Sequence, residues 1–323
     1  MKDSLRTLCE TFIENRDILT HHFRWENSQI LSLCASLFLG EKMRPDPEKL
    51  KACRDLIRRS AGVFSVFRSS HSFPLVCLLS MDKDPQRKLE RAMEIFRDLK
   101  ESYRSSDYLA LAAFMLTDFD CSREKIERGR NLYRIMNQEH PILTSREDTF
   151  FTALMAFSPR SDDRILRDME ELYRRLKERF RDSNCVQTMA EILATEEGDS
   201  GDKCDRVFRI YDRLKENGRK YGRHNELATL AALAVTDTET DELVRDILDA
   251  DAFLATQKGY GLLGPGAQAR LMHAAMIVSD GLVSHDAMNR AALSGTIAQV
   301  IAQEIALCAM VTSTAAVSAA SHS

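Results

Sequence analysis

The sequence repeats one pattern, in which a short and almost wholly apolar segment precedes a longer charged segment. The clearest copy is residues 73–106, where FPLVCLLSM is followed by a charged stretch that begins at Pro85. Apolar residues in this stretch, such as Leu89 and Phe96, recur at helical spacing, which predicts an amphipathic helix. We therefore expect a helical hairpin whose short helix is the more buried of the two.

Seven apolar segments of this kind occur along the chain, each with a small residue at the matching position. Neighbouring copies are 35 to 43 residues apart, a period typical of helical-hairpin arrays. One hairpin buries too little apolar surface to fold alone, so its neighbours must stack on it. The matching small residues are Ala35, Cys77, Ala112, Ala153, Ala190, Ala231 and Ala274.

The sequence therefore predicts an all-α fold, an array of about seven helical hairpins. Periodicity does not decide between an open superhelix and a closed α/α toroid. We expect one helical-repeat domain over residues 1–323, with an N-terminal capping helix in 1–27 and hairpin repeats in 28–285. An Ala/Ser-rich apolar C-terminal helix and tail should occupy 286–323. Side chains expected to be buried are Leu89, Phe96, Leu172 and Phe208.

Composition narrows the class of protein. Only 13 Gly and 7 Pro occur in 323 residues, few for a fold of sheets and turns. The net charge is −4 and Arg and Glu alternate along the same helices, so no nucleic-acid surface is expected. The eight cysteines are scattered without a CxxC pair, and the charged N-terminus lacks a secretory pattern. These features predict a cytoplasmic protein.

No catalytic, metal or cofactor signature stands out. The eight His form no HExxH motif, and no His/Cys cluster has the spacing of a zinc site, so no metal or cofactor is predicted. GYGLLGPG, at residues 259–266, superficially resembles a phosphate loop. No predicted strand precedes it and no GK[ST] follows it, so both nucleotide fingerprints fail. We interpret this segment as a connector.

The end of each charged helix carries a recurring group of an aromatic or apolar residue, an Arg and a small hydroxyl, as in Tyr103–Arg104–Ser105. If the short helices all start on one edge, their positive ends and these Arg side chains converge on an anionic ligand. In the alternative interpretation the aromatic residue packs, the hydroxyl caps and the Arg is solvated. The candidate ligand-binding residues are Arg68, Arg104, Asp107, Asp148, Arg181, Arg223, Glu226 and Arg270.

The C-terminal segment 291–320 is rich in Ala, Ile, Val, Ser and Thr, and Glu304 is its only formal charge. A membrane helix needs about 20 predominantly apolar residues, and here Gln299 and Gln303 interrupt the run. No basic flank follows the segment. We expect a buried or array-capping helix, with a membrane or interfacial anchor as the alternative.

Several stretches carry a resemblance to a known family, among them FRWENSQILSLCAS (23–36), GVFSVFRSS (62–70), HPILTSRED (140–148) and NELATLAALA (225–234). Together with the Ala/Ser-rich C-terminus, they make the chain resemble the bacterial domain-of-unknown-function family 4003. The resemblance covers essentially the whole chain. It implies a bacterial protein that forms one full-length unit, and it brings no activity, ligand or catalytic residue.

Two functions fit the sequence. The first is a non-enzymatic binding or scaffold protein, which holds a protein partner on its concave face and on the loops before the short helices. The second is an enzyme or a binder of a small anionic ligand, with a pocket at the rim of an α/α toroid. A closed ring with a polar central pocket would favour the second, and an open groove the first. We favour the first because no acid/base pair or nucleophile is recognisable.

Overall fold

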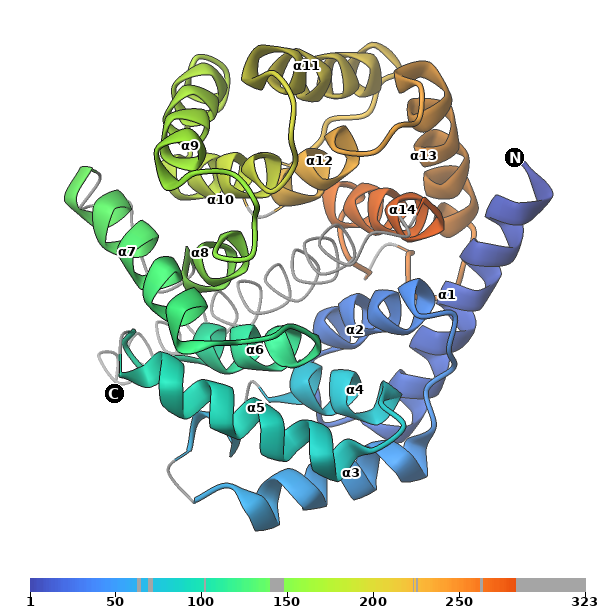
Figure 1. The fold of residues 1–323 in the computed structure, drawn as a ribbon. Helices are drawn as coiled ribbons and strands as arrows, with labels where there is room; N and C mark the ends of the chain where they lie inside the picture. The colour runs from blue at the N-terminus through green and yellow to red at the C-terminus, as the bar shows by residue number, and fades with distance from the viewer. Residues whose placement is uncertain are drawn as a thin grey trace, which may run out of the picture.

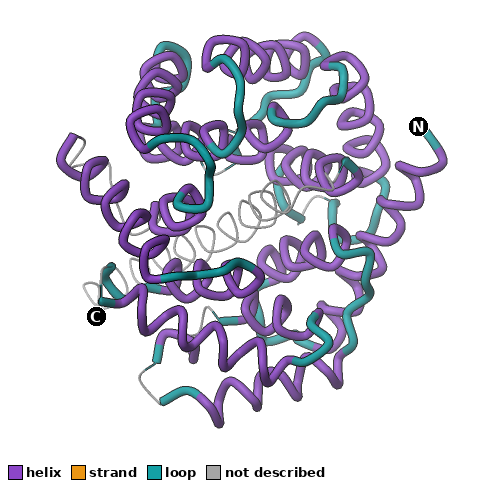
Figure 2. Tube along the Cα trace, in the orientation of Figure 1, coloured by secondary structure: helices purple, strands orange, loops and turns teal. Residues whose placement is uncertain are grey.

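The chain folds into helices that alternate between an inner and an outer set (Figure 1). The computed structural model describes residues 1–62, 65–68, 72–101, 103–139, 148–222, 224, 226–261 and 264–282. Within these ranges it has fourteen α-helices, two short 3₁₀ turns and no strand (Figure 2). The all-α prediction is therefore confirmed. The predictions for 286–323 and for the apolar segment 291–320 concern residues outside the described ranges.

The inner helices follow the apolar segments of the repeat and the outer helices follow the charged segments. The inner set is α2 (Ser28–Gly40), α4 (Phe73–Met81), α6 (Asp107–Met115), α8 (Thr149–Met155), α10 (Ser183–Ala194), α12 (Leu227–Ala234) and α14 (Ala267–Gly281). The outer set is α1 (Asp3–His22), α3 (Pro47–Ser60), α5 (Pro85–Lys100), α7 (Arg123–Glu139), α9 (Asp162–Lys177), α11 (Ser200–Glu216) and α13 (Thr240–Ala255). The 3₁₀ turns are η1 (Val66–Arg68) and η2 (Leu116–Asp118).

The contacts between helices run in two closed series. Each inner helix contacts the next inner helix, and α14 contacts α2. Each outer helix likewise contacts the next outer helix, and α13 contacts α1. The end of the described chain is therefore packed against its beginning, as Figure 1 shows at α1, α2 and α14.

Burial separates the two sets. All eight residues of α12 are buried, whereas α9 buries a single stripe that includes Ile165, Leu172 and Leu176. Such a stripe is the amphipathic pattern of a helix with one face in water. The side chain of Ser161 accepts a hydrogen bond from the backbone N–H of Arg164 and so caps the start of α9.

Two residues expected in the core lie at its edge instead. Leu89 and Leu172 are buried as predicted, but Phe96 and Phe208 are only half-buried. In α5 the buried face is centred on Ile95 rather than on Phe96. The ring of Phe96 lies edge-on against Phe67 with the ring centroids 5.1 Å apart, so it closes the side of the core.

Basic residues from the outer set bind carbonyl groups at the C-terminal ends of inner helices. Lys49 Nζ donates to the carbonyl of Asp82 after α4 at 2.7 Å. Arg128 donates to the carbonyl of Ala156 after α8 at 3.0 Å, and Lys203 to that of Leu193 in α10 at 2.9 Å. The last carbonyls of a helix have no partner within the helix. These basic residues therefore stabilise the inner helices from outside.

None of the helices in the described part of the chain combines the length and the apolar content required to cross a bilayer. The cytoplasmic location stays a prediction.

Candidate functional site

A cavity among the described residues lies where α1, α2 and the loop between α13 and α14 meet, and we call it the junction cavity. Its volume is about 910 Å³. The second half of α1, the loop between α1 and α2, the start of α2 and the loop between α13 and α14 enclose it. Side chains with positive charge in its lining are Arg16, Arg24 and Lys258, and Asp17 is the one acidic residue in the described lining.

Arg16 lines the junction cavity on the α1 side. Its side chain is nearly buried, and its Nε and Nη2 atoms donate to Asp17 Oδ1 at 3.0 and 2.6 Å. The guanidinium also lies 5.4 Å from the ring centroid of Tyr260, a cation–π contact. These contacts hold one cation of the lining in a fixed place.

Gly259 lies beside Arg16 in a turn whose backbone conformation favours glycine. Its φ of +93° is one that side-chain-bearing residues rarely adopt. A Cβ atom at this position would lie 3.4 Å from the Arg16 Nη1 atom, which is ordinary van der Waals contact. The turn conformation, rather than a lack of space beside α1, therefore favours glycine here.

A buried hydrogen-bonded pair, Tyr260 and His273, lies next to Arg16. Tyr260 Oη lies 2.7 Å from His273 Nδ1 on α14, and the His273 ring is close to Phe12 on α1. Burial, together with the smaller effect of the Arg16 charge, lowers the pKa of His273 to about 4. Burial also raises the pKa of Tyr260 above its usual value. Both groups are therefore neutral at pH 7, and their hydrogen bond fixes Tyr260 below Arg16.

Two cations in the lining are exposed. Arg24 and Lys258 form no hydrogen bond or ion pair with any described residue. Beside them lies the start of α2, where the Asn27 side chain accepts from the backbone N–H of Gln29 at 2.8 Å. The N-terminus of a helix attracts negative charge. The cavity thus offers two free cations and one helix N-terminus to an anionic group.

The only tryptophan of the chain lies at this edge. Trp25 follows Arg24 directly and is 66% exposed. Its loop is held by Arg54 of α3, which donates to Glu26 at 2.8 Å and lies 5.4 Å from the Trp25 ring centroid. Trp25 is therefore a fixed and solvent-accessible fluorophore beside the cavity.

None of the predicted ligand-binding residues lines the junction cavity as the structure describes it. Arg68 ends η1 and is half-buried, Arg104 is exposed before α6, and Asp107 opens α6. Asp148 is buried at the start of α8. Arg223 lies outside the described residues. Each of the others lies near the start of an inner helix, as the repeat predicts, and their binding role stays a prediction.

Arg270 makes a structural contact. Its Nε donates to Asp251 Oδ1 at 2.7 Å, while Arg219 Nε donates to the other oxygen of the same carboxylate at 2.7 Å. Asp251 is fully buried on α13. A buried carboxylate needs such partners, so these ion pairs join α13 to α14 and to the segment after α11.

Arg181 and Glu226 lie on either side of one further contact. Asp182, the residue after Arg181, accepts at its Oδ2 atom 2.7 Å from His224 Nδ1. The backbone N–H of His224 in turn donates to Glu226 Oε2 at 3.1 Å. This pair joins the starts of α10 and α12, so the structure brings these two predicted residues to one place on the edge.

No sequence pattern singles out the cations of the junction cavity. Residues 259–266 have the pattern of a connector, yet Gly259, Tyr260, Gly264 and Pro265, which lie between α13 and α14, also line the cavity. The available signal was glycine density beside Lys258. That signal does not identify a site, because the opposite wall comes from α1, more than 230 residues earlier in the chain. In the part of the chain that the structure describes, no group of acidic, His and Cys side chains is placed to hold a metal ion.

A match to a protein family covers both walls of the cavity. The family described as "Protein of unknown function (DUF4003)" matches residues 15–306. "Uncharacterized protein YeaA" of Bacillus subtilis (strain 168) is 23% identical over 248 residues, which is 73% of this chain and 75% of that protein. No solved structure matches the chain. Neither description assigns an activity, so the site has to be interpreted from its own chemistry.

Proposed function

We propose that this chain, which belongs to the DUF4003 family, is a binding protein for a small anionic ligand and that the junction cavity is its binding site. The observation that carries the proposal is the pair of free cations, Arg24 and Lys258, beside the buried Arg16 and the start of α2. Phosphate and carboxylate groups fit this combination, because both accept several hydrogen bonds from cations and from helix N-termini.

The arrangement of helices supports a rim site. We interpret the two closed series of contacts as an α/α toroid of seven hairpins, with the junction cavity at the rim where the first and last hairpins meet. Each inner helix follows a loop, and its first turn carries a partial positive charge. The cavity lies at one such start, that of α2.

The scaffold hypothesis concerns a different surface. It places a protein partner on the concave face and on the loops before the inner helices, where Arg104 and Arg181 are exposed. We keep it as the second candidate because these two exposed arginines recur at equivalent positions of the repeat. The experiment below separates the two sites.

The test is to titrate the full-length protein with inorganic phosphate, pyrophosphate and citrate. Binding is measured by calorimetry and by the change in Trp25 fluorescence. A contact to a charged group is worth about 1.5–3 kcal/mol. We therefore expect the double variant Arg24→Ala/Lys258→Ala to bind the best probe at least about 100-fold more weakly, at about 1.4 kcal/mol per tenfold.

Two matched double variants serve as controls. Arg97→Ala/Lys100→Ala removes the same residue types from the exposed end of α5 and should leave binding unchanged. Arg104→Ala/Arg181→Ala removes the arginines of the repeated helix ends. If this variant loses binding while the cavity variant does not, the ligand lies at the repeat edge and our assignment of the junction cavity is wrong. Failure of all three probes to bind at millimolar concentration would contradict an anion site.

A further inference from the structure

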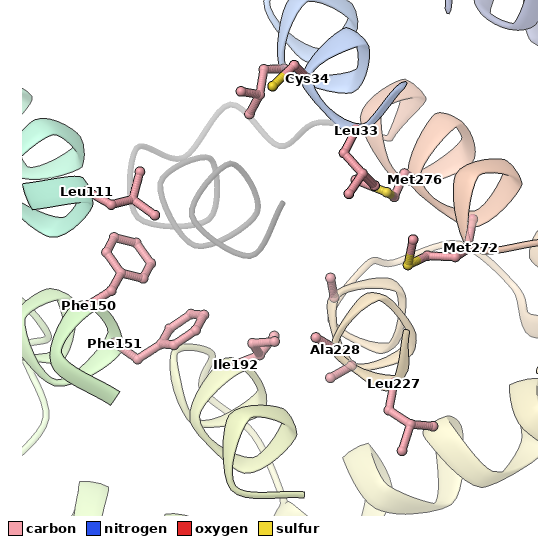
Figure 3. Close-up of a cluster of buried hydrophobic side chains, with 14 of the residues drawn as sticks. Leu33, Cys34, Leu111, Phe150, Phe151, Ile192, Leu227, Ala228, Met272 and Met276 are labelled. Atoms are coloured by element: carbon pink, nitrogen blue, oxygen red, sulfur yellow. The ribbon is translucent and has the colours of Figure 1, made fainter. Parts of the chain in front are cut away.

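The inner helices direct a set of apolar side chains toward a common centre, and we call this set the inner wall. Figure 3 shows these side chains arranged around that centre and projecting from helices on all sides of it. Two inner helices contribute aromatic or sulfur-containing pairs, Phe150 and Phe151 from α8 and Met272 and Met276 from α14. The remaining members are Leu33, Cys34, Leu111, Ile192 and Ala228.

The inner wall is covered. Phe150 and Phe151 have no exposed surface, and Leu33 and Met276 are 1% exposed. In α14, ten consecutive residues from Leu271 to Asp280 are buried, so that helix meets other atoms on every side. Outer helices cover the outward face, and neighbouring inner helices cover the flanks. The inward face requires a further partner.

None of the fourteen described helices runs through the centre, because all of them belong to the inner or the outer set (Figure 1). The last of them, α14, belongs to the inner wall itself and ends at Gly281. The chain continues beyond Leu282 with residues 283–323. This stretch begins beside the wall and is the longest part of the chain outside the described residues.

The chemistry of that stretch matches the wall. From Ala291 to Val317 it carries a single formal charge, at Glu304, and is otherwise mainly Ala, Ile, Val, Ser and Thr. Small side chains allow close packing in a confined space, and an apolar segment gains free energy when it covers an apolar face. A lipid-facing helix would instead favour large apolar residues with aromatic or basic flanks.

We propose that the inner wall is the binding site for the C-terminal segment 291–317 of the same chain. The segment fills the centre of the array, so it contacts inner helices from every part of the sequence. It is therefore an internal strut rather than a membrane anchor. This inference is independent of the anion site, since it rests on different residues.

The first test asks whether the segment stays bound without its covalent link. A specific protease site is introduced between residues 284 and 290 of the full-length chain, and the folded protein is cleaved and passed over a gel-filtration column. We expect the C-terminal fragment to elute with the rest of the protein. In the variant Phe151→Ala, the dissociation constant of the fragment should rise at least about 100-fold, equal to about 2.8 kcal/mol at 1.4 kcal/mol per tenfold.

The matched control is Phe67→Ala. Phe67 is as buried as Phe151, but its ring lies against Phe96 and Phe114, outside the inner wall as defined. This variant should leave the dissociation constant within about threefold, because Phe67 is not part of the inner wall. If the wild-type fragment separates from the protein, or if both variants weaken retention equally, the proposal is wrong.

The second test uses the native cysteines of the uncleaved chain. Cys34 is part of the inner wall, whereas Cys204 is buried elsewhere, on α11, with its Sγ 3.9 Å from the carbonyl of Leu172 on α9. In Ile301→Asp/Ile305→Asp the segment carries charge that the wall cannot accept. Maleimide labelling of Cys34, followed by mass spectrometry, should accelerate at least about tenfold while Cys204 stays protected.

The control for this test is Ser318→Asp/Ala319→Asp, which places the same charges beyond the segment and should leave Cys34 protected. If Cys34 labels at the same rate in all three proteins, the segment does not cover the wall. Wild-type protein is also floated with vesicles of phosphatidylcholine and phosphatidylglycerol. Flotation that depends on residues 291–317 would show that lipid is their partner and would overturn the proposal. Cross-linking of the segment to a second copy would do the same.

Discussion

The junction cavity and the inner wall share helix α2, yet their surfaces have opposite character. Helix α2 contributes to both: Ser28 and Gln29 line the cavity, while Leu33 and Cys34 belong to the wall. The difference arises from position along the helix, since the first turn carries free N–H groups and the middle turns carry none. Ligand binding and fold stability therefore depend on different residues of the same helix. Substitutions should separate them.

The largest effect is expected at the inner wall. Phe150 is fully buried and its ring lies 4.9 Å from that of Phe151. Phe150→Ala should lower the free energy of unfolding by about 3–5 kcal/mol, measured by guanidinium denaturation, because it removes apolar contacts and leaves a cavity. A loss below about 1 kcal/mol would show that the wall collapses around the change and is not tightly packed.

A smaller effect, dependent on pH, is expected behind the cavity wall. His273 has a pKa of about 4 in the folded protein, below its ordinary 6.5, so the unfolded state binds the proton more readily. Below pH 6.5 the unfolded state takes up a proton on this imidazole that the folded state does not bind. The free energy of unfolding therefore falls as the pH falls from 6.5 toward 4. Between pH 8 and pH 5, we expect stability to fall by about 2 kcal/mol from this group.

The measurement is chemical denaturation at both pH values. His273→Gln should abolish this part of the pH dependence, while His22→Gln, at an exposed position, should retain it. Equal pH dependence in the two variants would mean that His273 is not the group that titrates.

The contact that closes the array carries an uncompensated carboxyl group. Asp280 on α14 is buried beside Gly40 of α2, and its Oδ2 atom has no hydrogen-bond partner among the described residues. Burial, together with the nearby charge of Glu41, raises the pKa of Asp280 well above 3.8. The group therefore destabilises the fold increasingly as the pH rises above 3.8.

Asp280→Asn should consequently raise the free energy of unfolding at pH 7 by at least about 1 kcal/mol. The gain should shrink as the pH approaches 4, because the unfolded state then also keeps the proton. Denaturation curves at pH 7 and pH 4 measure both values. A loss of stability at pH 7 would show that the carboxylate has a stabilising partner in solution.

The smallest effect on stability is expected in the cavity lining. Arg24→Ala and Lys258→Ala remove exposed side chains without a described partner, so each should change the free energy of unfolding by less than about 0.5 kcal/mol. Thermal denaturation without ligand measures this. A larger loss of stability in either variant would show that the cavity lining stabilises the fold, which would contradict its assignment to ligand binding.

Much of the fold could be predicted from the sequence because helical periodicity is a local property. The alternation of apolar and charged segments placed the inner helix at 73–81 and the outer helix that begins at Pro85 where the structure has them. Phe96 shows the limit of this reasoning. Its spacing fits the apolar face of α5, but the packing of the folded chain buries Ile95 and leaves Phe96 at the edge of the core, against Phe67.

The candidate site could be predicted only in part. The sequence placed Arg104 and Arg181 near the starts of inner helices, where the structure has them. It gave no reason to pair Arg16 with Tyr260, because no local pattern relates residues so far apart. Arg270 was predicted as a ligand residue, yet the buried Asp251 engages its guanidinium.

The sequence by itself determined the helical class and which segments form the more buried helices. These properties follow from side-chain spacing within one or two turns. The tertiary structure decided that α14 meets α2 and α13 meets α1, and hence that a cavity exists between them. Such closure depends on the small rotation between successive hairpins, summed over the whole array. The sequence of one hairpin does not determine the total rotation, so the cavity forms only when the whole chain has folded.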